Sequence, residues 1–446
     1  MPYEFDEMNH RARQRDAHEI HKKLQQKRAK TLRLVTLCAI LSVCLLVLIV
    51  VAVRSGDPGA SVPDSTTTAP PQTTTAPTLP PETSAAPTAP TAPTNPETVI
   101  RLIFGGDLNI TDKVVAAGES NGSYDYTALL MDVAPILADA DATFLNLEGN
   151  FCGVPYGSGS ASAPQALANA LADAGVDFLQ LANSYTVFNG LTGLSATAHA
   201  IRSAGMLPTG VFLSETEQAQ NQGFTLVNIG GIRVAILAFT KGMDGMSLPA
   251  GSENCVNLLY TDYATTYQTV AEESIRAVLQ AAAAQEPDLT IALVHWGSEY
   301  NDTISPTQQA IAAMMLENGV DAIVGTHSHF VQSIDYDESA GTVIAWSLGD
   351  FLSNGEKAGT NYSILLQLEI TRDNRTGETK VSACDYTGLY LLTPEKDEEA
   401  MRLVRMEAAM TLYENNHISK VSDLAYENIR YAWQRIQART ASQNES

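Results

Sequence analysis

Residues 34–53 form an uninterrupted apolar stretch, LVTLCAILSVCLLVLIVVAV, which contains no charged residue. A helix of this length, rising about 1.5 Å per residue, crosses a hydrocarbon core of roughly 30 Å. The stretch therefore predicts a transmembrane helix over residues 34–54. It divides the chain into parts that fold in different surroundings and must be interpreted separately.

Basic residues are concentrated on one side of this stretch. The 33 residues before it carry nine Lys or Arg against five acidic residues, and Arg54 is the only nearby base after it. The positive-inside rule then predicts a cytoplasmic tail over residues 1–33 and an extracellular remainder. A cleaved signal peptide is the alternative, but the apolar run is too long for one and no convincing small-residue cleavage site follows. We expect an uncleaved, single-pass anchor in the cell membrane.

Residues 55–98 consist almost entirely of Pro, Thr, Ala and Ser, so they cannot bury a core and predict a disordered spacer. After residue 33 the chain has 18 basic against 45 acidic residues, which excludes nucleic acid as a partner. Outside the apolar stretch only Cys152, Cys255 and Cys384 occur, so at most one disulfide is possible. Stability must then come from a hydrophobic core rather than from a disulfide framework.

From residue 99 onward, strand and helix patterns alternate. Helices are expected over 163–174, 191–204 and 263–285 and from Ser305 onward, and a hairpin turn at 228–231. Strands are expected at 99–107, 142–149, 177–183, 289–297, 321–329, 342–351, 362–370 and 380–392. Two further helices are expected at 394–415 and 424–439. The pattern predicts an α/β layered domain over residues 99–393, with mixed sheets flanked by helices, and a helical extension over 394–446.

Polar side chains gather at the carboxyl ends of these predicted strands, where layered α/β folds bind their ligands. They are Asp107, Asn109, Asn146, Glu148, Asn183, His295, Glu299, His327 and His329. Mixed oxygen and imidazole donors favour Mn, Fe or Zn over Ca or Mg. The sequence thus predicts a divalent metal site at this end of the sheets.

Each residue also has a structural interpretation when it is taken alone. Asp107 follows two glycines and fits a turn or a helix cap, and Asn146 and Glu148 fit a half-exposed strand. His295 beside Trp296 fits a half-buried histidine with satisfied hydrogen bonds. The pair His327 and His329 is more specific, because an i, i+2 pair leaving a strand points both rings to one side, where a single metal accepts both.

Several short motifs occur together in a fixed order, namely Gly106-Asp107, Asn146 to Glu148, His295 to Tyr300, Pro306 to Gln309, Gly319 to Gln332 and Ser347 to Phe351. This order resembles that of the CapA (PgsA) family of poly-γ-glutamate capsule-synthesis proteins. The chain resembles this family over residues 99–370. The resemblance implies a fold like that of the calcineurin-like metallophosphatases and an anchored extracellular domain.

The resemblance also implies a set of site residues. Metal positions would be Asp107, Asn146, Glu148, Asn183, His295, His327 and His329. His295 and His329 would be catalytic and steady the developing charge, and Asn109, Glu299 and Gln332 would contact substrate. Such a cluster would hold two ions that polarise a phosphoryl group.

The chain departs from the family at one element of this site. Members carry Asn-Asn-His followed by an acid three residues later, whereas this chain has Asn183, Ser184, Tyr185 and then Phe188. Asp350 also stands where the family usually has asparagine. The loss of one imidazole and one carboxylate would weaken metal binding or reshape the site.

Three functional hypotheses follow. The first is a metal-dependent hydrolase of a phosphoester or a polymer linkage, which acts with membrane-bound synthase components on an envelope polymer. The second is a non-catalytic accessory subunit with a degenerate metal site, which binds the polymer or its synthase. The third is a structural wall protein in which the histidines serve packing alone.

Overall fold

A computed structural model describes residues 95–214, 216–217, 222–393, 400–415 and 421–440, which all belong to one compact unit, Thr88–Ser446. The predicted tail, transmembrane helix and nearly all of the spacer lie outside the described residues. Among the described residues, no helix has the length and apolar character needed to cross a membrane. Cys152, Cys255 and Cys384 are all free thiols.

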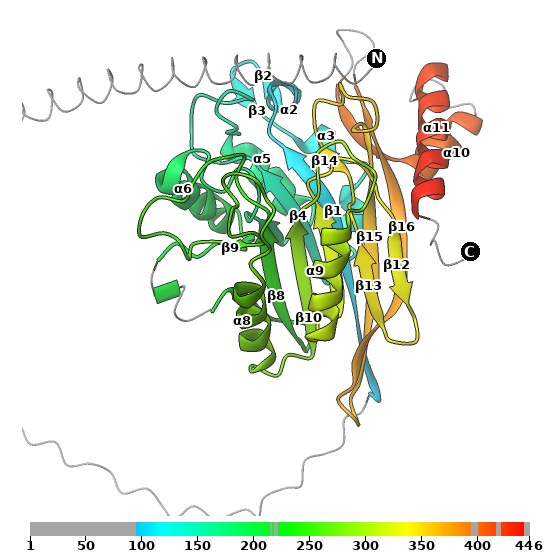
Figure 1. Cartoon of the computed structure of the whole chain (residues 1–446). Coiled ribbons are helices and arrows are strands. Elements are labelled where there is room, and N and C mark those ends of the chain that lie inside the picture. Colours follow the sequence, from blue (N-terminus) through cyan, green and yellow to red (C-terminus); the bar gives the residue numbers. More distant parts are fainter. Residues whose placement is uncertain (1–94, 215, 218–221, 394–399, 416–420, 441–446) are drawn as a thin grey trace, which may run out of the picture. The chain divides into compact units, whose positions relative to one another are not determined.

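Two mixed sheets make up the centre of the fold (Figure 1). The eight-stranded sheet has the order β17-β16-β15-β1-β4-β5-β6, with β14 paired to β1. Its strands are β1 (Glu97–Asn109), β4 (Ala142–Glu148), β5 (Phe178–Gln180), β6 (Leu207–Thr209), β14 (Asp350–Leu352), β15 (Tyr362–Asp373), β16 (Thr379–Leu392) and β17 (Arg402–Arg405). In this sheet β1, β4, β5, β6 and β14 run parallel, and β15, β16 and β17 add antiparallel pairs.

The seven-stranded sheet has the order β12-β13-β11-β10-β8-β7, with β9 paired to β8. Its strands are β7 (Phe224–Ile229), β8 (Ile232–Thr240), β9 (Asn257–Leu258), β10 (Leu289–His295), β11 (Ala322–Thr326), β12 (Ile334–Asp337) and β13 (Thr342–Ala345). The β7–β8 hairpin confirms the predicted turn, where Gly230 and Gly231 take the positive φ values that a tight hairpin requires.

Helices flank both sheets. They are α2 (Asp112–Ala117), α3 (Thr127–Leu130), α4 (Ala134–Leu137), α5 (Gln165–Asp173), α6 (Gly190–Ser203), α8 (Glu272–Ala283), α9 (Pro306–Glu317), α10 (Met406–Glu414) and α11 (Asp423–Thr440). Ser305 caps α9 through a capping box with Gln308, and Pro306 is its first residue. A small ribbon of β2 (Glu119–Ser120) and β3 (Ser123–Tyr124) completes the fold.

Alternation along the strands sorts side chains into separate cores. In β1, Leu102 and Phe104 pack into the core between the sheets, whereas Ile103 packs among the residues of α5 and α6. In β10, Ile291 also faces the inter-sheet core, and Ala292 packs among the residues of α8 and α9. The architecture is therefore helix, sheet, sheet, helix, which confirms the predicted layered α/β domain with mixed sheets.

Aspartates at the amino ends of the parallel strands each form a pair of hydrogen bonds with a neighbouring strand. In each case the Asp backbone N–H donates to a residue on the neighbouring strand, and the Asp carboxylate accepts the backbone N–H of that same residue. Both bonds fix the register, so the polar residues at the opposite ends of the strands also align. The pairs are Asp141 with Arg101, Asp177 with Thr143, Asp288 with Arg233 and Asp321 with Thr290.

The structure differs most from the predicted elements in three places. Residues 342–351 form not one strand but two, β13 and β14, which lie in different sheets. Gly349, with φ +77°, permits the bend between them. The helix predicted over 263–285 covers only 272–283, and within 394–415 residues 402–405 form β17 before α10 begins.

The C-terminal helices pack against the eight-stranded sheet, with Ile429 and Ile436 of α11 in the inter-sheet core cluster. Figure 1 shows α10 and α11 beside β16. Arg439 near the end of α11 donates to Asp302 (2.9 Å) and to the carbonyl of Val331 (3.4 Å). Through Arg439, α11 thus contacts one segment before and one segment after the predicted pair His327 and His329.

Candidate metal centre

The carboxyl ends of strands from both sheets meet at one buried site. Asp107 and Glu148 lie at the ends of β1 and β4 in one sheet, and His295 ends β10 in the other. His327 and His329 follow β11 directly. All five side chains are buried, with exposed fractions of 6% or less, so the predicted grouping of these residues is observed.

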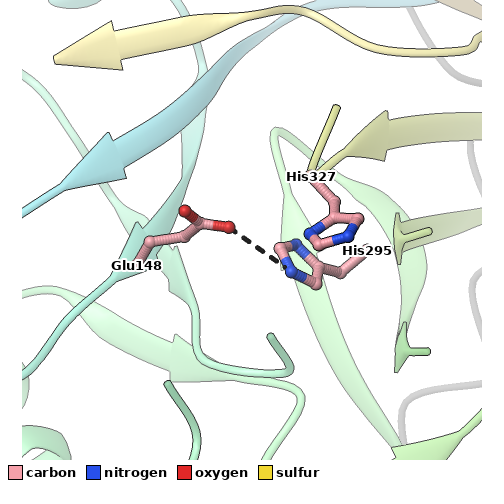
Figure 2. Close-up of side chains that lie close together, drawn as sticks. All are labelled: Glu148, His295 and His327. Carbon is pink, nitrogen blue, oxygen red and sulfur yellow. Dashed lines mark ion pairs between the residues drawn. The ribbon is translucent and has the colours of Figure 1, made fainter. Parts of the chain in front are cut away.

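These residues form two groups that share one carboxylate. Glu148, His295 and His327 make the first group, and Asp107, Glu148 and His329 make the second. Within each group, one donor atom from each residue lies within 4.8 Å of the others. Figure 2 shows the first group, with the Glu148 carboxylate directed toward the His295 ring.

Glu148 presents a different oxygen to each group. Its Oε1 lies 3.3 Å from Nε2 of His295, and its Oε2 lies 4.0 Å from Nε2 of His329. A carboxylate that faces two sets of donors with its two oxygens is suited to bridge two cations. This arrangement is compatible with a divalent metal site.

Two buried atoms at the site support this interpretation. Among the described residues, Glu148 Oε1 and His327 Nδ1 have no hydrogen-bond partner. A buried polar atom without a partner costs about 1–3 kcal/mol, more when it is charged, so native structures seldom leave one. Metal coordination would satisfy both atoms, and the donor set of carboxylate and imidazole fits a divalent ion.

An amide network holds Asp107 in place. Asn146 Nδ2 donates to Asp107 Oδ1 (2.6 Å), and the backbone N–H of His327 donates to Oδ2 (3.0 Å). Asn183 Nδ2 in turn donates to Asn146 Oδ1 (2.9 Å). Asn146 and Asn183 therefore lie at the site in supporting contacts, and their predicted role as metal ligands stays a prediction.

His295 and His327 are held in the neutral form. Burial, reinforced by the neighbouring histidines and Lys241, lowers the pKa of both rings well below the ordinary value. Thr326 Oγ1 lies 3.1 Å from His295 Nδ1, and the Ser184 backbone N–H lies 3.3 Å from Nε2. The Ser184 N–H is the donor to Nε2, so a metal at His295 would replace that hydrogen bond, whereas His327 Nδ1 has no partner among the described residues.

In the second group the pKa values are raised, in contrast to those of His295 and His327. Burial raises the pKa of Asp107 to about 6 and, together with Asp107, raises that of Glu148 well above its usual range. Burial opposes the charged form of His329, but Glu148, Asp350 and Asp107 outweigh it and raise its pKa well above the ordinary value. The carboxyl groups of Asp107 and Glu148 and the imidazole of His329 therefore tend to hold protons. A bound cation would displace these protons.

The backbone at the site is strained. His327, His329 and Tyr300 have φ values of +90°, +59° and +57°, although none is glycine. Such conformations cost of order 1–3 kcal/mol each and cluster at functional sites. The β11 strand ends at Thr326, earlier than predicted, and the two histidine rings lie with centroids 6.2 Å apart. The two rings belong to different donor groups, and the expectation that a single ion accepts both stays a prediction.

A small cavity of about 170 Å³ opens onto the second group. Asn109 and Glu299 line it, and their role as substrate contacts stays a prediction. Gln332 does not line it, because its side chain is buried and donates to the carbonyl of Asn301 (2.9 Å). A larger cavity of about 900 Å³ lies between β9 and α8 and contains none of the predicted site residues.

Four ionisable residues of the cavity wall were not assigned to the site from the sequence. Tyr300 stacks on His329 with ring centroids 5.0 Å apart, and Lys357 Nζ lies 3.3 Å from the centroid of Tyr300. Tyr185 and Asp350 complete the group. Tyr300 and Asp350 lie in recognised motifs, so a signal was present, whereas nothing in the sequence around Lys357 points to the site.

Residues 101–355 match the sequence model of the family described as "Bacterial capsule synthesis protein PGA_cap". The chain belongs to this family. All predicted site residues of this PGA_cap member lie within the matched segment, and the predicted family resemblance is confirmed.

Two curated relatives carry related names. The chain is 31% identical over 223 residues to "Capsule biosynthesis protein CapA" of Bacillus anthracis, which covers 48% of this chain and 49% of the relative. It is 27% identical over 215 residues to "PGA biosynthesis protein CapA" of Bacillus subtilis (strain 168), covering 48% and 52%. The chain thus spans about half the length of these relatives.

Among solved structures, the calcineurin-like phosphoesterase YfkN from Bacillus subtilis is similar at 13% identity and a TM-score of 0.39, covering 76% of this chain and 99% of that one. The layers and the strand order of this PGA_cap protein follow from the hydrogen bonds between its own strands.

Proposed function

We propose that this protein is a metal-dependent phosphoester hydrolase that acts in the synthesis, export or anchoring of a surface polymer of the poly-γ-glutamate capsule type. The observation that carries the proposal is Glu148, whose two oxygens face two buried donor groups. A centre of two cations about a shared carboxylate is suited to phosphoester hydrolysis.

The chain's own residues have distinct parts in this chemistry. Bound divalent ions would supply Lewis-acid polarisation of a phosphoryl oxygen. His295 and His327 are neutral and present lone pairs, and Asn146 orients Asp107. His329 lines the cavity beside Glu299 and Tyr300, and it would act on negative charge that develops on the substrate through the ion that it helps to hold.

The charge of the cavity supports dependence on metal. Glu148, Glu299 and Asp350 line it, against Lys357 as the single Lys or Arg of its described wall. An anionic substrate would be repelled by the buried carboxyl groups of Glu148 and Asp350 and by the exposed Glu299 unless cations neutralise them. The names of both Bacillus relatives support a role in capsule or polymer biosynthesis.

The proposed location follows from the sequence. Residues 34–53 would anchor the protein in the cell membrane, with the N-terminus in the cytoplasm and the metal centre outside, near the polymer and membrane-bound synthase components. Protease added to intact protoplasts should remove the C-terminal part while a tag at residue 1 stays protected. Protection of both ends would contradict this topology.

The activity is tested with the full-length chain loaded with Mn²⁺ and a generic phosphodiester such as bis(p-nitrophenyl) phosphate. Turnover should require the metal and should fall by at least about 100-fold in His327→Ala, as expected when a ligand of a catalytic ion is lost. His199→Ala is the matched control, because His199 is exposed on α6 and should leave turnover unchanged.

The same assay distinguishes the hydrolase hypothesis from the accessory-subunit hypothesis. Stoichiometric metal without turnover of any phosphomonoester or phosphodiester would contradict the hydrolase. Turnover that persists in His327→Ala would place the activity elsewhere.

A further inference from the structure

Asp350 reaches the metal centre through an unusual backbone arrangement. The chain leaves β13 of the seven-stranded sheet and crosses to β14, whose first residue, Asp350, pairs with Asp107 of β1. The backbone N–H of Asp107 donates to the carbonyl of Gly349 (3.0 Å). Two Gly-Asp dipeptides therefore lie side by side and place both carboxyl groups in one buried site.

One oxygen of Asp350 contacts two predicted site residues. Its Oδ1 accepts from Asn109 Nδ2 (3.0 Å) and lies 2.8 Å from His329 Nδ1. The carboxylate is 5% exposed, so these contacts are largely shielded from water. We propose that Asp350 is a positioning residue of the metal centre, which fixes Asn109 and His329 relative to Glu148.

The two nitrogens of His329 have different surroundings. Nδ1 faces Asp350 and, at 3.7 Å, Asp107 Oδ2, whereas Nε2 faces Glu148 Oε2 at 4.0 Å. A proton on Nδ1 would serve the two aspartates and, in the neutral ring of a metal-bound His329, would leave the Nε2 lone pair on the side of the shared carboxylate. A metal-binding histidine commonly donates its other N–H to a carboxylate, which fixes the ring and raises its basicity.

Asn109 is held by the same oxygen. It is the last residue of β1 and lies opposite Glu148 in the β1–β4 register. Its amide nitrogen is committed to Asp350, and its side chain lines the cavity with Glu148 and His329. Asp350 thus connects the end of β1 to the loop after β11, which come from different sheets.

The test measures Mn²⁺ affinity of the full-length chain by titration calorimetry. Asp350→Ala removes the acceptor and should weaken the affinity by about 10- to 100-fold, the usual effect of losing a residue that orients a ligand. Asp350→Asn keeps an acceptor oxygen and should lose about tenfold or less. Asp139→Ala is the control, because Asp139 makes only an exposed ion pair with Arg101, and it should leave the affinity unchanged.

A second readout separates positioning from general damage. In Zn²⁺-loaded protein, ¹⁵N-histidine NMR should show His329 protonated at Nδ1, and Asp350→Ala should shift that signal while the His199 signal stays unchanged. An affinity within twofold of wild type in Asp350→Ala would overturn the proposal. So would a loss in Asp350→Asn equal to that of His329→Ala, because Asp350 would then be a direct ligand.

The proposal rests on the metal centre of the proposed function but not on turnover. A wild-type chain that binds no ion would contradict the proposed function as well as this inference. Wild-type binding with an unaffected Asp350→Ala variant would contradict this inference alone.

Discussion

Gly106 lies so close to the neighbouring strand that no side chain fits there. A Cβ at this position would lie 1.7 Å from the carbonyl oxygen of Gly349. That carbonyl accepts the backbone N–H of Asp107, so the close approach is what brings Asp350 beside Asp107. Gly106 must therefore be a glycine because the backbone at Gly349 lies so close to it, and not because of a turn at Gly106 itself.

Gly106→Ala should therefore damage the metal centre without changing any ligand. We expect a loss of about 1–3 kcal/mol in the free energy of unfolding, the usual cost of overpacking, together with loss of Mn²⁺ binding. Urea unfolding and calorimetric titration measure the two effects. Gly159→Ala is the control, because a Cβ there meets no described atom within 4 Å. Equal behaviour of the two variants would contradict the close approach.

The protons of the second group make metal binding depend on pH. Asp107, with a pKa of about 6, Glu148 and His329 all hold protons more tightly than usual, so at pH 6 a cation must displace them. Mn²⁺ affinity should consequently rise with pH, by up to about tenfold per unit for each displaced proton, and level off once the groups are deprotonated. Calorimetry between pH 5.5 and 8 measures this slope. A flat or falling affinity would contradict the shifts.

At the scale of strands and helices, the aspartates at the amino ends of the strands set the register. Thr143 is fully buried, and its backbone N–H donates to Asp177 Oδ2 (2.9 Å). Asp177→Ala should leave that donor without a partner and cost about 1–3 kcal/mol in the free energy of unfolding, measured with urea. Asp139→Ala removes only an exposed ion pair with Arg101 and should cost less than about 0.5 kcal/mol. A similar cost for both would show that the register pairs add no stability.

The sequence was sufficient to predict most elements that carry the site. Apolar runs that end at polar residues identified β1, β4, β10 and β11, and the family resemblance brought Asp107, Glu148 and the three histidines together. The crossing at 346–349 was not predictable, because an apolar run of ten residues has the same pattern whether it stays in one sheet or passes between two. The separate directions of His327 and His329 depend on two positive φ values, which residue type does not reveal.

At the scale of the whole molecule, the compact unit extends beyond the segment that the family model matches. The match ends at residue 355, yet β15 pairs with β1 along Glu97–Phe104 and its inner residues belong to the inter-sheet core. The same sheet continues through β16 to β17. The matched segment alone therefore lacks strands that its own core requires.

A chain that ends after residue 355 should consequently fail to fold. Far-UV circular dichroism and urea titration should show no cooperative transition for the part after residue 94, whereas a chain that ends after residue 440 should unfold cooperatively. The longer chain keeps α11 and its contacts to Asp302 and Val331. Cooperative unfolding of the shorter chain would contradict this account of the core.

The shared carboxylate is tested most directly by the metal content of the purified full-length chain, measured by mass spectrometry after loading with Mn²⁺. The two donor groups predict two ions per wild-type chain, about one in His327→Ala, and loss of both in Glu148→Gln, because Glu148 belongs to both groups. His199→Ala should retain both ions. Two ions retained in Glu148→Gln, or none in the wild type, would contradict the shared-carboxylate centre.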